Sequence, residues 1–101
     1  MPDSPPLLHV YGQGAWHEDA YIVGNIAGLI RLYAAVGAAC RSLEHHSSIE
    51  VSTNDGEGYA VHIIRLEDAA RWIRLAVPYT ADVAEERRES AIWPPDLRVS
   101  E

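Results

Sequence analysis

The stretch YIVGNIAGLIRLYAAVGAACR, residues 21–41, decides the fold of this chain. It opens with a short apolar run that ends at Gly24, and the side chain of Asn25 can then accept from the free amides of a first helical turn. From residue 26 to residue 41, apolar side chains recur at the three- and four-residue spacings of one helix face. That face carries Ile26, Leu29, Ile30, Tyr33, Val36, Gly37 and Cys40. The stretch therefore predicts a strand followed by a helix over 26–41, which packs on a sheet by this face.

The back of the same helix is also nearly free of charge, because Arg31 and Arg41 are its only charged residues. A surface helix is normally polar on the side that faces water. We therefore expect the chain's own sheet on one side of this helix and a second subunit on the other, which predicts a homo-oligomer. The alternative is that the C-terminal segment folds back over the helix. The predicted subunit interface consists of Ala27, Arg31, Leu32, Ala35 and Ala39.

Outward from the helix, apolar residues alternate or cluster in short runs that predict strands. These runs cover residues 7–11, 19–24, 49–53, 59–65 and 72–77. The sequence NDGEG at 54–58 accepts positive φ and predicts an antiparallel hairpin between the third and fourth runs. One helical turn is expected over 66–71, and a second helix is expected over 80–88.

The order β-β-α-β-β-β-α predicts an α+β fold, a mainly antiparallel sheet with one long helix packed on one face. The chain has 101 residues, of which 48% are hydrophobic and 23% charged, a composition typical of one globular domain. We expect a single domain over 1–101, with loose tails at 1–6 and 97–101.

Charge and cysteine content indicate which partners and which compartment to expect. The net charge is −7, from 15 acidic and 8 basic residues, so nucleic acid and anionic lipid surfaces are poor partners. No apolar run reaches the roughly 20 residues that a membrane span requires. The single cysteine, Cys40, cannot form an internal disulfide, and we expect a reducing, cytoplasmic compartment.

Motifs for catalysis and for metal binding do not emerge from the sequence. The five histidines, which include the neighbours His45 and His46, do not stand in metal-ligand spacing. No nucleophile elbow, catalytic cysteine signature or phosphate loop is present. We expect no metal, no cofactor and no catalysis. A small-molecule enzyme stays as a minor alternative, with His17, Glu18 and Asp19 as its first acid or base residues.

In the absence of a catalytic or metal motif, the sequence predicts a surface that binds a ligand or a partner protein. The turn at Gly24 and Asn25 places free helix amides where an anion can bind. Aromatic residues outside the predicted elements, together with an arginine, suit a nucleotide-like ligand or the loop of a partner protein. The full set of predicted ligand-binding residues is Trp16, His17, Gly24, Asn25, Arg65, Tyr79 and Trp93.

The run YIVGNIAGL at 21–29, a strand that leads into G-N-x-x-G-L and a helix, resembles a group of small bacterial and prophage proteins. The group includes a family of immunity proteins from polymorphic toxin systems. In that family the helix is likewise followed by strands joined by an acidic, glycine-containing turn, here residues 55–58. The resemblance covers residues 19–66 and implies a non-catalytic protein of genetic conflict that acts by binding.

Two functions then compete. In the first, a homo-oligomer sequesters a small nucleotide-derived signal, as phage counter-defence proteins do. In the second, an immunity protein neutralises a toxin by direct binding, for which an acidic surface is apt because many toxin nucleases are basic.

Overall fold

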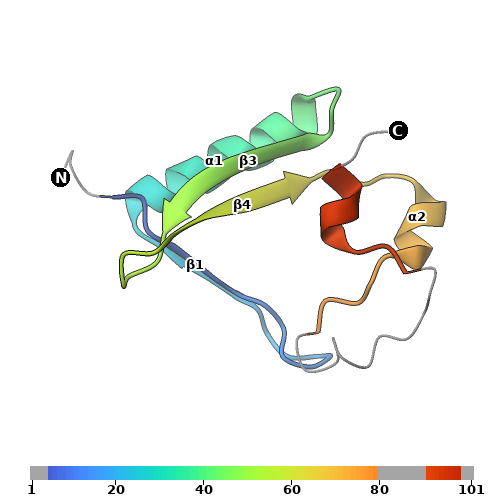
Figure 1. Ribbon diagram of the computed structural model, residues 1–101, viewed down its shortest axis with the longest axis horizontal. Coiled ribbons are helices and arrows are strands. Elements are labelled where there is room, and N and C mark those ends of the chain that lie inside the picture. Colours follow the sequence, from blue (N-terminus) through green and yellow to red (C-terminus); the bar gives the residue numbers. More distant parts are fainter. Residues whose placement is uncertain (1–4, 80–90, 99–101) are drawn as a thin grey trace. The chain divides into compact units, whose positions relative to one another are not determined.

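The computed structural model describes residues 5–79 and 91–98 (Figure 1). The chain separates into two compact units, each built from two stretches of sequence. Unit 1 comprises Met1–Val10 and Ile22–Arg65, and unit 2 comprises Tyr11–Tyr21 and Leu66–Glu101. The single domain expected over 1–101 stays a prediction.

A long helix and a hairpin form the body of unit 1. The helix α1 spans Ile26–Arg41, and the strands β3 and β4 span His46–Ser52 and Gly58–Ile64. The strands pair antiparallel over seven residues each, from His46 opposite Ile64 to Ser52 opposite Gly58. At the turn Thr53 donates its amide to the Glu57 carbonyl at 2.9 Å, and Gly56 adopts a φ of 91°. That left-handed conformation explains why glycine stands there.

Helix α1 packs on the hairpin face that carries Ser47 and Val51. Ser47 Oγ donates to the Ala35 carbonyl at 2.6 Å, and Val51 is only 2% exposed. Arg31 Nη1 reaches the Glu50 carbonyl at 2.6 Å. The other face of the hairpin carries the alternate residues of both strands, among them the exposed Ser48 and His62.

A second pair of strands precedes α1. Strand β1 spans Leu8–Tyr11 and β2 spans Tyr21–Gly24, and the two form their own antiparallel two-stranded sheet. The start of β1 is tied to the hairpin turn, because Leu7 bridges Ser52 in parallel and the Ser52 amide donates to Pro6 at 2.9 Å. Leu8 is fully buried, and Tyr59 Oη donates to its carbonyl at 2.5 Å. The segment expected as a loose tail therefore includes a bonded Pro6.

Unit 2 contains a short helix and a single bridge between distant segments. Helix α2 spans Ala69–Arg74 and is capped by Asp68, whose carboxylate accepts from the Ala70 amide at 2.9 Å. Leu75 forms a parallel bridge with Ile92, just before the 3-10 helix η2 at Pro94–Arg98. Ala76 and Ile92, each 8% exposed, are its buried hydrophobic residues among those described.

The predicted α+β class is confirmed, and so are the bounds of the long helix. The strand predicted over 72–77 is wrong, because most of that run lies in or at the end of α2. An N-cap at Asp68 outweighs the strand preference of Trp72 and Ile73. The strands form two separate sheets rather than one. The helix expected over 80–88 lies outside the described residues.

A membrane-spanning helix is not found among the described residues, since none of their helices has the necessary length and apolar character.

Candidate functional site

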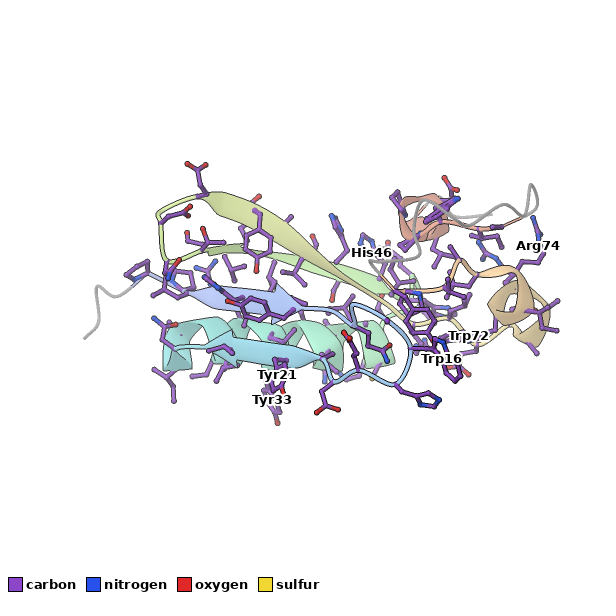
Figure 2. The ribbon with its side chains drawn as sticks, turned by 90° about the horizontal axis from the view of Figure 1, so that it is seen from below. Trp16, Tyr21, Tyr33, His46, Trp72 and Arg74 are labelled. Atoms are coloured by element: carbon purple, nitrogen blue, oxygen red, sulfur yellow. The ribbon has the colours of Figure 1, made fainter. Side chains whose placement is uncertain are left out.

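The outer face of α1 in unit 1 is apolar and exposed. We call it the α1 stripe, and it consists of Ile26, Leu29, Ile30, Tyr33 and Val36. Tyr33 is 81% exposed and Ile26 is 78% exposed. Figure 2 shows Tyr33 projecting from α1 on the side opposite β3 and β4. The stripe belongs to the face predicted to pack on the sheet, so the predicted orientation of the helix is wrong.

The hairpin instead meets the small residues of α1. Gly28, Ala35 and Ala39 are its buried residues. Short side chains let a helix approach its neighbour closely, and the Ser47 bond to Ala35 requires such an approach. Cys40, expected on the buried face, is exposed as a free thiol.

The predicted subunit interface changes for the same reason. Ala35 and Ala39 are 3% and 2% exposed within one chain, so these two residues are not available to a second subunit. Ala27 and Leu32 are half-buried, and Arg31 is exposed with its guanidinium bonded to Glu50. The alanine-rich side of α1 is the intrachain packing face.

At the start of α1, where an anion site is predicted, the Asn25 side chain bonds to the chain itself. Asn25 Oδ1 accepts from the amides of Leu7 at 3.0 Å and Gly28 at 2.8 Å, and its Nδ2 donates to Pro5 at 2.8 Å. Gly24 and Gly28 lie against the Leu7 carbonyl, where a Cβ would stand 2.8 Å and 2.0 Å from its oxygen. The turn therefore joins β1 to the helix.

Arg65 has a similar structural role at the other end of α1. Its Nε donates to the Ala39 carbonyl at 3.0 Å and its Nη2 to the Ser42 carbonyl at 3.0 Å. Carbonyls at a helix C-terminus lack intrahelical partners, and a cation there is favourable. Arg65 thus links the end of β4 to the end of α1.

The other predicted ligand residues belong to unit 2. Trp16 is 63% exposed, and its ring centroid lies 4.2 Å from that of His17, which adopts a φ of 72°. Trp93 is 36% exposed and Tyr79 is half-exposed. Glu18, named as a possible acid or base, accepts the Ala15 amide at 3.3 Å and closes the loop.

The sequence did not predict the pair of histidines that the hairpin brings together. His46 Nε2 and His62 Nδ1 lie 3.1 Å apart, with ring centroids 5.3 Å apart and an interplanar angle of 20°. His46, expected in a loop, is the first residue of β3. The register of the predicted hairpin was the available signal, because it places His62 opposite Ser48, two residues from His46.

The hairpin turn contains a carboxyl group whose pKa is shifted by its hydrogen bonds. A hydrogen bond from the Thr53 hydroxyl, followed by one from the Glu57 amide, lowers the pKa of Asp55 below its ordinary value of 3.8. Asp55 is fully exposed, and its hydrogen bonds stabilise the geometry of the turn.

Over residues 5–79 and 91–98, no group of three or more His, Cys, Asp or Glu side chains is arranged to hold a metal ion.

Comparisons with protein families, with characterised proteins and with solved structures gave no match.

Proposed function

We propose that this chain is a non-catalytic binding protein that works as a homo-oligomer, and that its subunits meet across the α1 stripe. The observation that carries the proposal is the exposure of five large apolar side chains in a row on one helix. Contiguous exposed apolar patches on soluble proteins mark interaction sites.

Charge favours a second copy of the chain as the occupant of the stripe. The chain as a whole has a net charge of −7, so most of its surface repels another copy. The stripe itself contains no charged residue, and a two-fold interface brings a patch against itself. Tyr33 lies at the middle of α1, where antiparallel helices related by a two-fold axis would place it beside its own counterpart.

The area of the α1 stripe is too small to form a stable interface by itself. A 16-residue helix is about 24 Å long, and a stable interface buries roughly 800 Å² on each partner, more than one helix face offers. Strand β2, which leads directly into α1, also exposes Ile22 at 54% on one of its faces and Val23 at 57% on the other. We therefore propose that β2 extends the interface.

The test compares the same substitution on two exposed isoleucines. Ile30→Glu places a charge in the α1 stripe, whereas Ile73→Glu places it on α2, where Ile73 is 76% exposed. Sedimentation of the wild type should show an oligomer at micromolar concentration. Ile30→Glu should dissociate it, because an unpaired carboxylate is costly to bury, and Ile73→Glu should not.

Circular dichroism should show both variants folded. A monomeric wild type contradicts the proposal. So does dissociation by Ile73→Glu alone, which would move the interface to unit 2.

For the molecule that the oligomer holds, we propose a small nucleotide-derived signal, on the basis of the resemblance at residues 19–66. The exposed Trp16 beside His17 supports the proposal, since aromatic planes stack on bases. A native mass spectrum of protein purified without denaturation should contain a bound small anion, and Trp16→Ala should reduce its occupancy. Recovery of the anion chemically unchanged after heat denaturation would support sequestration over turnover.

The alternative is an immunity protein that binds a toxin, and two observations favour it. Asn25 and Arg65, two of the predicted anion ligands, are engaged in bonds within the chain. The net charge of −7 also suits a basic partner. In that case the native spectrum would lack a small ligand, and a basic toxin domain would bind with a strong dependence on salt.

We further propose a cytoplasmic location, since the free Cys40 thiol is exposed.

A further inference from the structure

We propose that His46 and His62 form a binding site for a late divalent transition-metal ion on the hairpin face that α1 does not cover. The site is independent of the α1 stripe and of any bound signal. It rests on three observations, namely the spacing of the two ring nitrogens, the pairing of the strands that carry them, and the access of water to the pair.

The spacing of the nitrogens fits a shared ion. Imidazole nitrogens bind zinc at about 2.0–2.1 Å, and two such ligands at a tetrahedral angle stand roughly 3.3 Å apart. Nε2 of His46 and Nδ1 of His62 are already 3.1 Å apart. The two nitrogens face each other in the hydrogen-bonded pair, so each ring would turn by roughly 35° to direct its lone pair at one shared ion.

Without an ion, one of these two nitrogens carries a hydrogen and donates it to the other. A bound ion takes the place of that hydrogen. The proton moves through water to the other nitrogen of the same ring, so each imidazole stays neutral and no proton is released overall.

The backbone holds the two histidines in place. His46 and His62 belong to strands paired over their full length, with His62 opposite Ser48. Beyond the last pair, the Arg65 amide donates to the His45 carbonyl at 2.8 Å, which extends the ladder past His46. The two ring-bearing positions are therefore fixed before an ion arrives, and little ordering is needed on binding.

The surroundings indicate a reversible site. His62 is exposed and His46 half-buried, and no third ligand of the usual types joins them among the described residues. Water would fill the remaining positions. Resident zinc sites use three or four protein ligands, so we expect weaker, exchangeable binding. The preference of nitrogen ligands should give the order Cu²⁺ above Ni²⁺ or Zn²⁺, with no uptake of Mg²⁺.

The experiment titrates untagged protein with CuCl₂, NiCl₂, ZnCl₂ and MgCl₂ by calorimetry. The wild type should bind one Cu²⁺ per chain, and His46→Gln or His62→Gln should each weaken binding by about tenfold or more, because one of two ligands is lost. The matched control is His45→Asn, which removes the neighbouring imidazole at a position of φ 61° that asparagine tolerates. It should bind Cu²⁺ like the wild type.

NMR supplies a second readout that does not depend on affinity. Substoichiometric Cu²⁺ should broaden the ring resonances of His46 and His62 before those of His9 and His17. The proposal is overturned if both glutamine variants bind as the wild type does, or if His45→Asn shows the only loss. Ile30→Glu, which tests the oligomer, should leave metal binding unchanged, so the two proposals can fail separately.

Discussion

Gly28 and Gly37 lie in the same helix but have opposite surroundings. A Cβ on Gly28 would stand 2.0 Å from the Leu7 carbonyl oxygen, and further backbone atoms of Leu7 lie behind it. A Cβ on Gly37 would meet only the end of the flexible Arg41 side chain, at 2.9 Å from Nη1. The close approach at Gly28 is part of how residues 5–7 close the start of α1.

These surroundings predict opposite effects of the same substitution. Gly28→Ala should lower the free energy of unfolding by roughly 1–3 kcal/mol, because backbone atoms must move to admit the methyl group. Gly37→Ala should raise it by about 0.5–1 kcal/mol, because alanine loses less conformational entropy in a helix. Urea unfolding monitored by circular dichroism measures both. A stabilising Gly28→Ala would mean that the Leu7 backbone does not lie against α1 as described.

Single residues also show how far the sequence could predict a site. The role of Asn25 as an N-cap follows from local chemistry, and the structure has its side chain accepting from Gly28. Its bonds to Pro5 and Leu7 depend on a chain segment far away in sequence. The sequence pattern around Asn25 gives no sign of these distant contacts. The helix amides at this turn were therefore expected to be free to bind an anion.

At the scale of the element, α1 shows why helix bounds are easier to predict than helix orientation. Its start follows from the cap at Asn25, and its predicted end at Arg41 is also correct. Its orientation was wrong because both sides are apolar, so hydropathy alone did not distinguish them. The size of the side chains decided the outcome, since the buried alanines Ala35 and Ala39 allow the close contact that the hairpin makes.

Adjacent alanines test this orientation. Ala35 is 3% exposed against the hairpin, whereas Ala34 is exposed. Ala35→Leu should reduce the free energy of unfolding by about 1–3 kcal/mol through overpacking, and Ala34→Leu should leave it nearly unchanged. Thermal and urea unfolding measure the difference. If Ala34→Leu proved the costlier of the two, Ala35 would not be the alanine that packs against the hairpin.

The candidate metal site could not be predicted from the sequence, because it depends on how two strands pair. His46 and His62 are 16 residues apart in sequence, and no motif spacing links them. Their meeting depends on the register of the hairpin, which the turn at 54–58 sets. The sequence predicted that turn, but the first strand was expected to begin at 49 and actually begins at His46.

At the scale of the whole molecule, the two units differ in how their backbone is protected. Unit 1 contains the seven-residue ladder of β3 and β4 and a 16-residue helix with buried residues. In unit 2, helix α2 has six residues and none of them is buried. Regions with few buried contacts open at a lower free energy than the core of a protein.

Amide hydrogen exchange should therefore separate the units. The Ala39 amide in α1 should exchange more slowly than the Trp72 amide in α2 by about tenfold or more, which corresponds to ~1.4 kcal/mol of opening free energy. Gly28→Ala should accelerate exchange in α1 and leave Trp72 unchanged, because α2 opens without the rest of the chain. Equal acceleration at both amides would instead mean that residues 1–101 open as one cooperative domain. In that case the chain crossings between the units, at residues 10–11, 21–22 and 65–66, would transmit the loss of stability from unit 1 to unit 2.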